Sequence, residues 1–200
     1  MAIAKLYQRQ KRYKESLETY KKYLDLASTP FEMSRGKTEI AHVYISQGEY
    51  YKGLKTLDEI IEEYPKTEFA ADAQLLKANI YADKIKDYES AIKEYEKIIK
   101  EYPDNWMVKT PFALEQIASC YIQLKKYDEA IAIYEKIIND YSNTPFEKAA
   151  KLRIEFIKEY EKKGKPVPPE VIMKRMKEIG LGEGIINVEI KDGKTITNVK

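Results

Sequence analysis

Four segments of fifteen residues place apolar side chains three and four positions apart, with Lys and Glu between them. They cover residues 13–27, 50–64, 88–102 and 127–141, and the last two, YESAIKEYEKIIKEY and YDEAIAIYEKIINDY, are nearly the same. Spacings of three and four put side chains on one stripe of an α-helix. Each segment is therefore predicted to be an amphipathic helix whose Lys and Glu columns face solvent.

The shared columns also predict how these helices pack. When the four segments are aligned, each of the fifteen positions forms a column of four residues. The residues of the fourth column are all small, which lets a neighbouring helix approach closely. The residues of the eighth column are large and apolar, and they fill the space between helices. The fourth-column residues are Ser16, Gly53, Ala91 and Ala130, and the eighth-column residues are Tyr20, Leu57, Tyr95 and Tyr134.

A second shared element precedes each segment and completes a repeating unit. It has the form Ala-x-x-Tyr within its own helical stretch and ends in a short polar turn; its copies begin at Ala4, Ala41, Ala78 and Ala118. The first tyrosines of the second helices, Tyr13, Tyr50, Tyr88 and Tyr127, are 37, 38 and 39 residues apart. A nearly fixed period of this size is typical of a solenoid, in which each helix pair buries its apolar face against its neighbours.

The pattern Ala-x-x-Tyr, turn, Tyr-x-x-Ala-Ile-x-x-Tyr, followed by Glu-Tyr-Pro, resembles the tetratricopeptide repeat over roughly residues 2–141. The long period and segments such as YPKTEFAADAQLLKANIY resemble repeats of bacterial envelope proteins, namely the outer-membrane assembly lipoprotein and the Tol–Pal-associated coordinator. The resemblance implies an all-α fold, a right-handed solenoid of antiparallel helix pairs. It also implies a concave groove, lined by the first helix of each unit, that binds a partner protein.

By this resemblance, the groove residues flank the Ala-x-x-Tyr element. They are Arg35, Thr38, His42 and Ser46 in repeat two, Asp72, Leu75, Asn79 and Asp83 in repeat three, and Glu115, Ser119 and Gln123 in repeat four. Family members that hold the carboxyl terminus of chaperones use a Lys/Asn cluster here; only Asn79 fits it, and Glu115 would repel a carboxylate. Charge reversal at Arg35 or Glu115 is expected to change partner binding with little effect on stability, because exposed charges contribute little.

The chain leaves the repeat pattern after residue 141. Residues 142–163 are predicted to form a capping helix, and GKPVPP a helix-breaking linker before a short helix over 169–180. Alternation of Ile186, Val188 and Ile190 with Thr195, Thr197 and Val199 around Asp192-Gly193 then predicts a β-hairpin. The expected division is a solenoid at 1–163, a linker and short helix at 164–184, and a hairpin tail at 185–200. The tail is expected to dock on the helix near residues 171–176, or on a partner's strand through Ile186, Val188, Ile190, Thr197 and Val199.

Little in the chain points to catalysis or to a cofactor. His42 is the only histidine and Cys120 the only cysteine, so a two-histidine metal site and an internal disulfide are both impossible within the chain. There is no phosphate-binding glycine loop, and a net charge of +2 gives no reason to expect nucleic acid. Trp106 lies in the longest connection between repeats, where it either locks two repeats together or anchors a partner.

These observations predict a non-catalytic scaffold that binds a partner segment in the groove. The alternative is a structural subunit of a larger assembly that docks through the hairpin and the solenoid ends, with self-association or strand pairing. The sequence contains no run of about 18 apolar residues, so no transmembrane helix is expected. The segment MAIAKLYQRQ lacks the features of a secretory signal. A cytoplasmic or an envelope-associated location is therefore left open. The abundance of Lys and Glu is typical of proteins from hot environments.

Overall fold

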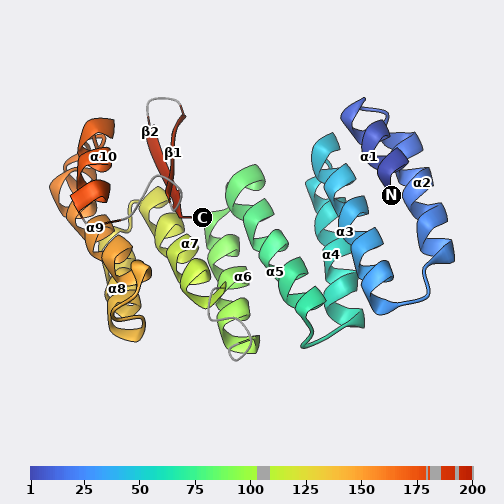
Figure 1. The fold of residues 1–200 in the computed structure, drawn as a ribbon, viewed down its shortest axis with the longest axis horizontal. Helices are drawn as coiled ribbons and strands as arrows, with labels where there is room; N and C mark the ends of the chain where they lie inside the picture. The colour runs from blue at the N-terminus through green and yellow to red at the C-terminus, as the bar shows by residue number, and fades with distance from the viewer. Residues whose placement is uncertain (103–108, 179, 181–185, 192–193, 200) are drawn as a thin grey trace. The chain divides into compact units, whose positions relative to one another are not determined.

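The structure is a computed structural model that describes residues 1–102, 109–178, 180, 186–191 and 194–199. The chain divides into two compact units, residues 1–105 and residues 106–200. α-Helices make up most of both units (Figure 1), as the repeat pattern predicts. Within the described ranges, none of the helices is both long and apolar enough to cross a membrane.

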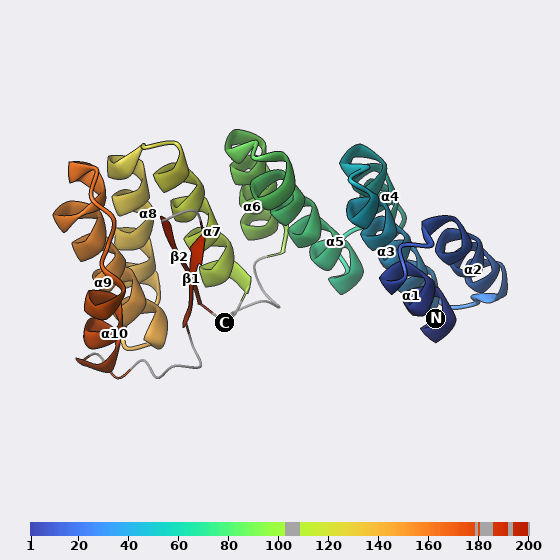
Figure 2. The ribbon, with the colours of Figure 1, turned by 90° about the horizontal axis from the view of Figure 1, so that it is seen from above.

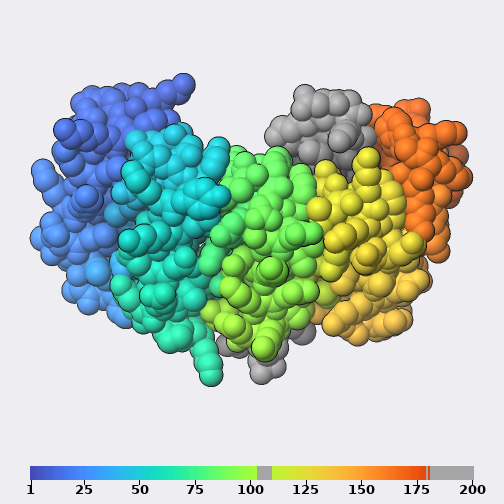
Figure 3. Space-filling view, turned by 180° about the vertical axis from the view of Figure 1, so that it is seen from behind, coloured from blue at the N-terminus to red at the C-terminus, as the bar shows by residue number. Residues whose placement is uncertain are grey.

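Unit 1 consists of three antiparallel helix pairs. Its helices are α1 (Ala2–Arg9), α2 (Tyr13–Leu26), α3 (Pro30–Gln47), α4 (Tyr50–Glu63), α5 (Glu68–Asn79) with the π-helix η1 (Ile80–Ile85), and α6 (Tyr88–Glu101). Seen from above in Figure 2, the first helices α1, α3 and α5 lie on one side of unit 1, and the second helices α2, α4 and α6 lie on the other. The space-filling view in Figure 3, seen from behind, shows α4 to α6, cyan to green, packed as one continuous surface.

The small column of the repeat lies where the two helices of a pair come closest. In repeat one, the Ser16 hydroxyl donates a 2.8 Å hydrogen bond to the Ala4 carbonyl. In repeat two, a Cβ added to Gly53 would lie 3.3 Å from the Ala41 carbonyl oxygen, which is tight. Ala91 and Ala130 are fully buried. The predicted close contact at this column is therefore confirmed.

Tyrosines of the eighth column fill the core and still satisfy their hydroxyl groups. Tyr20, Tyr95 and Tyr134 are all buried. The Tyr20 hydroxyl donates to Glu39 at 3.3 Å, and the Tyr95 hydroxyl donates to Asn79 at 2.6 Å. A buried tyrosine normally needs such a partner, so the column places one polar contact inside an otherwise apolar interface.

The turn inside each repeat requires one residue with a positive φ, two positions before the first tyrosine of the second helix. Gly48 occupies this position in repeat two at φ 80°, whereas Lys11, Lys86 and Lys125 occupy it in the other repeats at φ 59° to 64°. A left-handed conformation costs a residue with a Cβ more than it costs glycine. Three of the four turns therefore hold a lysine in an unfavourable backbone conformation.

Unit 2 contains the fourth repeat and the elements that follow it. Its helices are α7 (Lys109–Gln123), α8 (Tyr127–Asp140), α9 (Pro145–Glu159), the 3-10 helix η2 (Glu161–Lys163) and α10 (Pro169–Glu178). Ile172 and Met176 of α10 share a buried cluster with Leu152 and Phe156 of α9. Val167, from the proline-rich segment between them, is buried in the same cluster. This segment therefore holds α10 against α9.

Two strands follow α10, β1 (Ile186–Lys191) and β2 (Lys194–Val199). They pair antiparallel, with Ile186 opposite Val199, Val188 opposite Thr197, and Ile190 opposite Thr195. The expected turn at Asp192-Gly193 lies outside the described residues, as does Trp106.

Candidate partner-binding surface

The exposed side of α3 carries the four predicted residues of repeat two. Arg35, Thr38, His42 and Ser46 follow one another at intervals of three and four positions, so they share one face of the helix. Arg35 and Ser46 are exposed and the other two are half-buried. The Arg35 guanidinium lies 6.0 Å from the centre of the Phe31 ring, which is itself 56% exposed. This end of the face therefore offers a cation and an aromatic ring together.

The other end of the same face is joined to repeat one. The Gln8 amide donates to the Ser46 hydroxyl at 3.0 Å and to the His42 carbonyl at 3.3 Å, and the Tyr13 hydroxyl donates to the Ser46 carbonyl at 3.1 Å. Burial lowers the pKa of His42; the Lys5 charge acts in the same direction and Glu39 in the opposite one. Ser46 is therefore engaged within the protein, and the imidazole remains neutral at neutral pH.

On α5 and η1 the predicted residues of repeat three form a more acidic face. Asp72 and Asp83 are exposed, and Leu75 and Asn79 are half-buried. The Asn79 side-chain oxygen accepts the hydrogen bond from Tyr95, so its amide group is held in a fixed orientation. The structure thus brings carboxylates, an apolar side chain and an oriented amide onto one side of this helix.

Repeat three has one residue more than the other repeats between its two helices. Seven positions separate Tyr81 from Tyr88, whereas six separate Tyr44 from Tyr50. The structure absorbs the extra residue as the π-helix η1, and the Asp87 N–H reaches back six residues to the Tyr81 carbonyl at 3.0 Å. π-Helices are rare and often lie at functional sites. Here the π-helix contains Asp83, one of the predicted binding residues.

The structure corrects the expectation for Glu115 in repeat four. This residue is only 8% exposed and borders a small pocket that Tyr134, Phe146 and Arg153 also line. Burial raises the pKa of the Glu115 carboxyl to about 7, although the positive charge of Arg153 opposes the rise. The prediction of an exposed charge was wrong because this side of α7 is covered by α8 and α9. Ser119 is half-buried and Gln123 is exposed.

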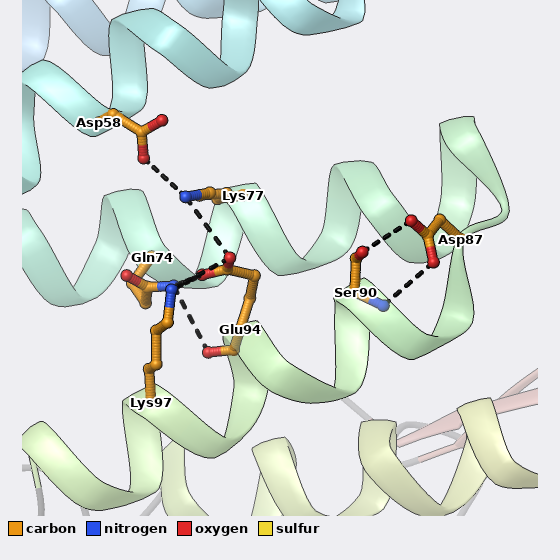
Figure 4. Close-up of polar contacts among 7 residues, drawn as sticks. All are labelled: Asp58, Gln74, Lys77, Asp87, Ser90, Glu94 and Lys97. Carbon is orange, nitrogen blue, oxygen red and sulfur yellow. Dashed lines mark hydrogen bonds and ion pairs between the residues drawn. The ribbon is translucent and has the colours of Figure 1, made fainter.

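A buried polar network joins repeats two and three (Figure 4). The Lys77 ammonium on α5 lies 2.7 Å from Asp58 of α4 and 3.5 Å from Glu94 of α6. Glu94 also accepts hydrogen bonds from Gln74 and, at 3.0 Å, from Lys97. The Lys77 and Glu94 side chains are only 12% and 11% exposed. Burial disfavours the charge on Lys77, but Asp58 and Glu94 outweigh it and raise its pKa above the ordinary value.

This network contradicts the expectation that every Glu and Lys column faces solvent. Glu94 lies outside the apolar columns, in the seventh column, yet it is buried because Lys77, Gln74 and Lys97 satisfy its carboxylate. The repeat alignment contains a signal that would have revealed the site. Lys77 immediately precedes Ala78, and the other three copies have isoleucine at that position: Ile3, Ile40 and Ile117.

The described residues contain no cluster of three or more His, Cys, Asp or Glu side chains that could hold a metal ion. Cys120 is a buried thiol on α7. A small core residue fits that place, since cysteine is among the most frequently buried side chains.

Three family models, each described as a tetratricopeptide repeat, match residues 1–30, 38–105 and 112–144. Together they cover more than half of the chain and agree with the helix pairs described above. The chain belongs to the tetratricopeptide repeat family. No curated protein matches the sequence.

Solved structures support the same fold. The TPR-like repeats of a Podosopora anserina protein assigned as a kinesin light chain match with a TM-score of 0.61 at 13% identity, covering 89% of this chain and 90% of that one. A tetratricopeptide repeat protein from Parabacteroides merdae matches with a TM-score of 0.59 at 16% identity, covering 89% of this chain and 64% of that one. At these identities the likeness shows the fold alone, an all-helical solenoid of the tetratricopeptide type.

Proposed function

We propose that this protein is a non-catalytic scaffold that binds a segment of a partner protein on the exposed side of α3 and of α5 with η1. Tetratricopeptide repeats generally mediate protein–protein interaction, and scaffolds built from them are typically non-catalytic. The observation that carries the proposal is the arrangement of the predicted residues. Exposed Arg35, Asp72 and Asp83, with half-buried Leu75, lie on first helices that share one side of unit 1 (Figure 2).

The chemistry of this surface favours a segment with mixed character. Arg35 over Phe31 suits a carboxylate beside an apolar group, whereas Asp72 and Asp83 suit a basic residue. Asn79, held by Tyr95, adds a group that hydrogen-bonds to a peptide backbone. An extended or helical segment that carries charges of both signs would match these groups.

Site-specific photo-crosslinking tests this proposal. Benzoyl-phenylalanine replaces Thr38 or Leu75 on the proposed surface, or Tyr51 on α4 as a control, since Tyr51 is 73% exposed on a second helix. In an extract of the source organism, one protein should crosslink at positions 38 and 75 and not at 51. Crosslinks from position 51 alone would place the partner on the second helices and refute the proposal.

A second candidate function is that of a subunit docked through the hairpin into a larger assembly, in the envelope or elsewhere. The strand register supports it, because Ile186, Val188 and Ile190 stand opposite Val199, Thr197 and Thr195, and a two-stranded sheet is only marginally stable alone. A strand of a second copy or of another subunit would complete it. Benzoyl-phenylalanine at position 189 distinguishes the two functions: crosslinks from 189 without any from 38 or 75 favour the subunit.

A further inference from the structure

The Lys77–Glu94 pair occupies two positions at which repeat four has isoleucines. Lys77 corresponds to Ile117, which is buried on α7. Glu94 is the seventh residue of its segment and corresponds to Ile133 on α8. Repeat three is therefore ionic where repeat four is aliphatic.

Stability does not explain this exchange. Removing two charges from water costs free energy that their mutual attraction only partly returns, and replacing a buried ion pair by well-packed apolar residues is often neutral or stabilising. The network is well satisfied, with Asp58, Gln74 and Lys97 completing it, so it is tolerated. A role in selecting the correct partner helix explains the ion pair better. Buried polar residues have this role in coiled coils, where they fix the register and the number of helices.

The chain contains a second helix, α8, that resembles α6 closely enough to pair with α5 in its place. α6 and α8 lie in segments that share nine of fifteen residues. Among the six positions that differ, only the seventh is buried in either helix: Glu94 is buried and Ile133 is half-buried. At every other buried position the two segments are the same, so apolar packing alone hardly distinguishes them.

We propose that the Lys77–Glu94 pair fixes the pairing of α5 with α6 and excludes α8, whether α8 comes from the same chain or from a second copy. If α8 replaced α6, Lys77 would keep Asp58 but would face Ile133 in place of Glu94, and Glu94 would lose both Lys77 and Gln74. A buried charge that loses part of its compensation is costly. Exchange of like elements between copies is a characteristic failure of repeat proteins, and the ion pair acts against it.

Two variants remove the difference between the repeats in opposite ways. Lys77→Ile with Glu94→Ile makes both repeats aliphatic, and Ile117→Lys with Ile133→Glu makes both ionic. Each protein is unfolded in denaturant, refolded at several concentrations and passed over a sizing column. The measured quantity is the fraction that returns to the elution volume of protein that was never unfolded.

Both variants should show an increase of about two-fold or more in the fraction that elutes elsewhere, rising with concentration. The aliphatic variant also carries Gln74→Leu, because Glu94→Ile would leave the buried Gln74 amide without its carboxylate acceptor. It should misassemble despite a melting temperature equal to or above that of the wild type, which separates pairing from stability. Glu49→Gln with Lys52→Gln removes an exposed ion pair of α4 and should refold as the wild type does. If the aliphatic variant refolds with the wild-type yield, the proposal is wrong.

Discussion

Repeats three and four have closely similar second helices but bury different charges beneath them. On α5 the buried charge is Lys77, and three oppositely charged or polar side chains from three helices surround it and its partner Glu94 (Figure 4). On α7 the buried charge is Glu115, which lies three positions before its repeat alanine, where repeat three has Leu75. The described neighbours give Glu115 one cation, Arg153, which is shared with Tyr134 at 3.2 Å and with Glu161 at 3.7 Å.

The difference shows how the same helix pair accommodates a buried charge in two ways. Lys77 remains ionised because its counter-charges outweigh burial. Glu115 lacks comparable compensation, so burial dominates and its pKa rises. Repeat three should therefore be insensitive to pH near neutrality, whereas repeat four should respond to it.

The largest expected effect is on the pH dependence of stability, through Glu115. The pKa of its carboxyl is about 7 in the folded protein and 4.5 as a free group. The folded state then binds the proton more tightly, so this stabilisation is complete below pH 4.5 and is lost as the pH rises through 7. A shift of this size corresponds to about 3 kcal/mol in the free energy of unfolding.

Glu115→Gln provides the measurement, because the amide cannot ionise. Urea unfolding at several values between pH 4.5 and 8 should give a free energy for the wild type that falls, relative to the variant, by about that amount. The groups around Glu115 that titrate or carry charge, Arg153, Tyr134 and Glu161, are unchanged in both proteins. A constant difference across this pH range would mean that Glu115 is ionised throughout.

The next effect tests what the two repeats share, the small column. Ala91→Leu in repeat three and Ala130→Leu in repeat four should each lower the free energy of unfolding by roughly 1–3 kcal/mol, because both alanines are fully buried and overpacking forces the helices apart. Ala132→Leu, at an exposed position of α8, should have little effect. Thermal melting of the three variants makes the comparison, and a wild-type melting temperature for Ala130→Leu would contradict the repeat register.

Most of the fold could be predicted from the columns of the repeat, because a residue type that recurs in four copies indicates a shared structural position. Ala91 and Ala130 occupy a column that is small in every copy, and their burial was predicted for that reason. The positions on α3 were also predictable, since three- and four-residue spacing places Arg35, Thr38 and His42 on one face. Whether that face binds a partner stays a prediction.

The features in which single repeats differ, two buried glutamates and one π-helix, could not be predicted from what the four copies share. Glu115 and Glu94 are charged, and charged side chains are almost never buried unless paired, so sequence reasoning placed both at the surface. Their burial depends on Arg153 and Lys77, which lie 38 and 17 positions away in the sequence. The π-helix depends on how one extra residue is absorbed, and a longer turn would have been an equally reasonable expectation.

A smaller gain in stability is expected at the turns. Lys86→Gly in repeat three and Lys125→Gly in repeat four replace residues with φ 64° and 59°. Each should raise the free energy of unfolding by about 0.5–1 kcal/mol, because glycine adopts this conformation without the Cβ penalty. Equal gains would show that the turn after the π-helix has the same strain as the turn after an ordinary α-helix. Gly48→Lys should have the opposite effect, and a gain there would contradict the assignment.

The smallest effect on stability is expected where the repeats differ only at the surface. Asp83 in η1 and Gln123 in α7 are both exposed and hold the same predicted place in repeats three and four. Asp83→Gln and Gln123→Asp should each change the free energy of unfolding by less than about 0.5 kcal/mol, as exposed substitutions usually do.

The effects of these two substitutions on binding should differ. If the partner crosslinked from positions 38 and 75 uses the acidic face of repeat three, Asp83→Gln should weaken its capture more than Gln123→Asp does. Equal capture by both variants, measured against the wild type at the same protein concentration, would show that Asp83 takes no part in binding.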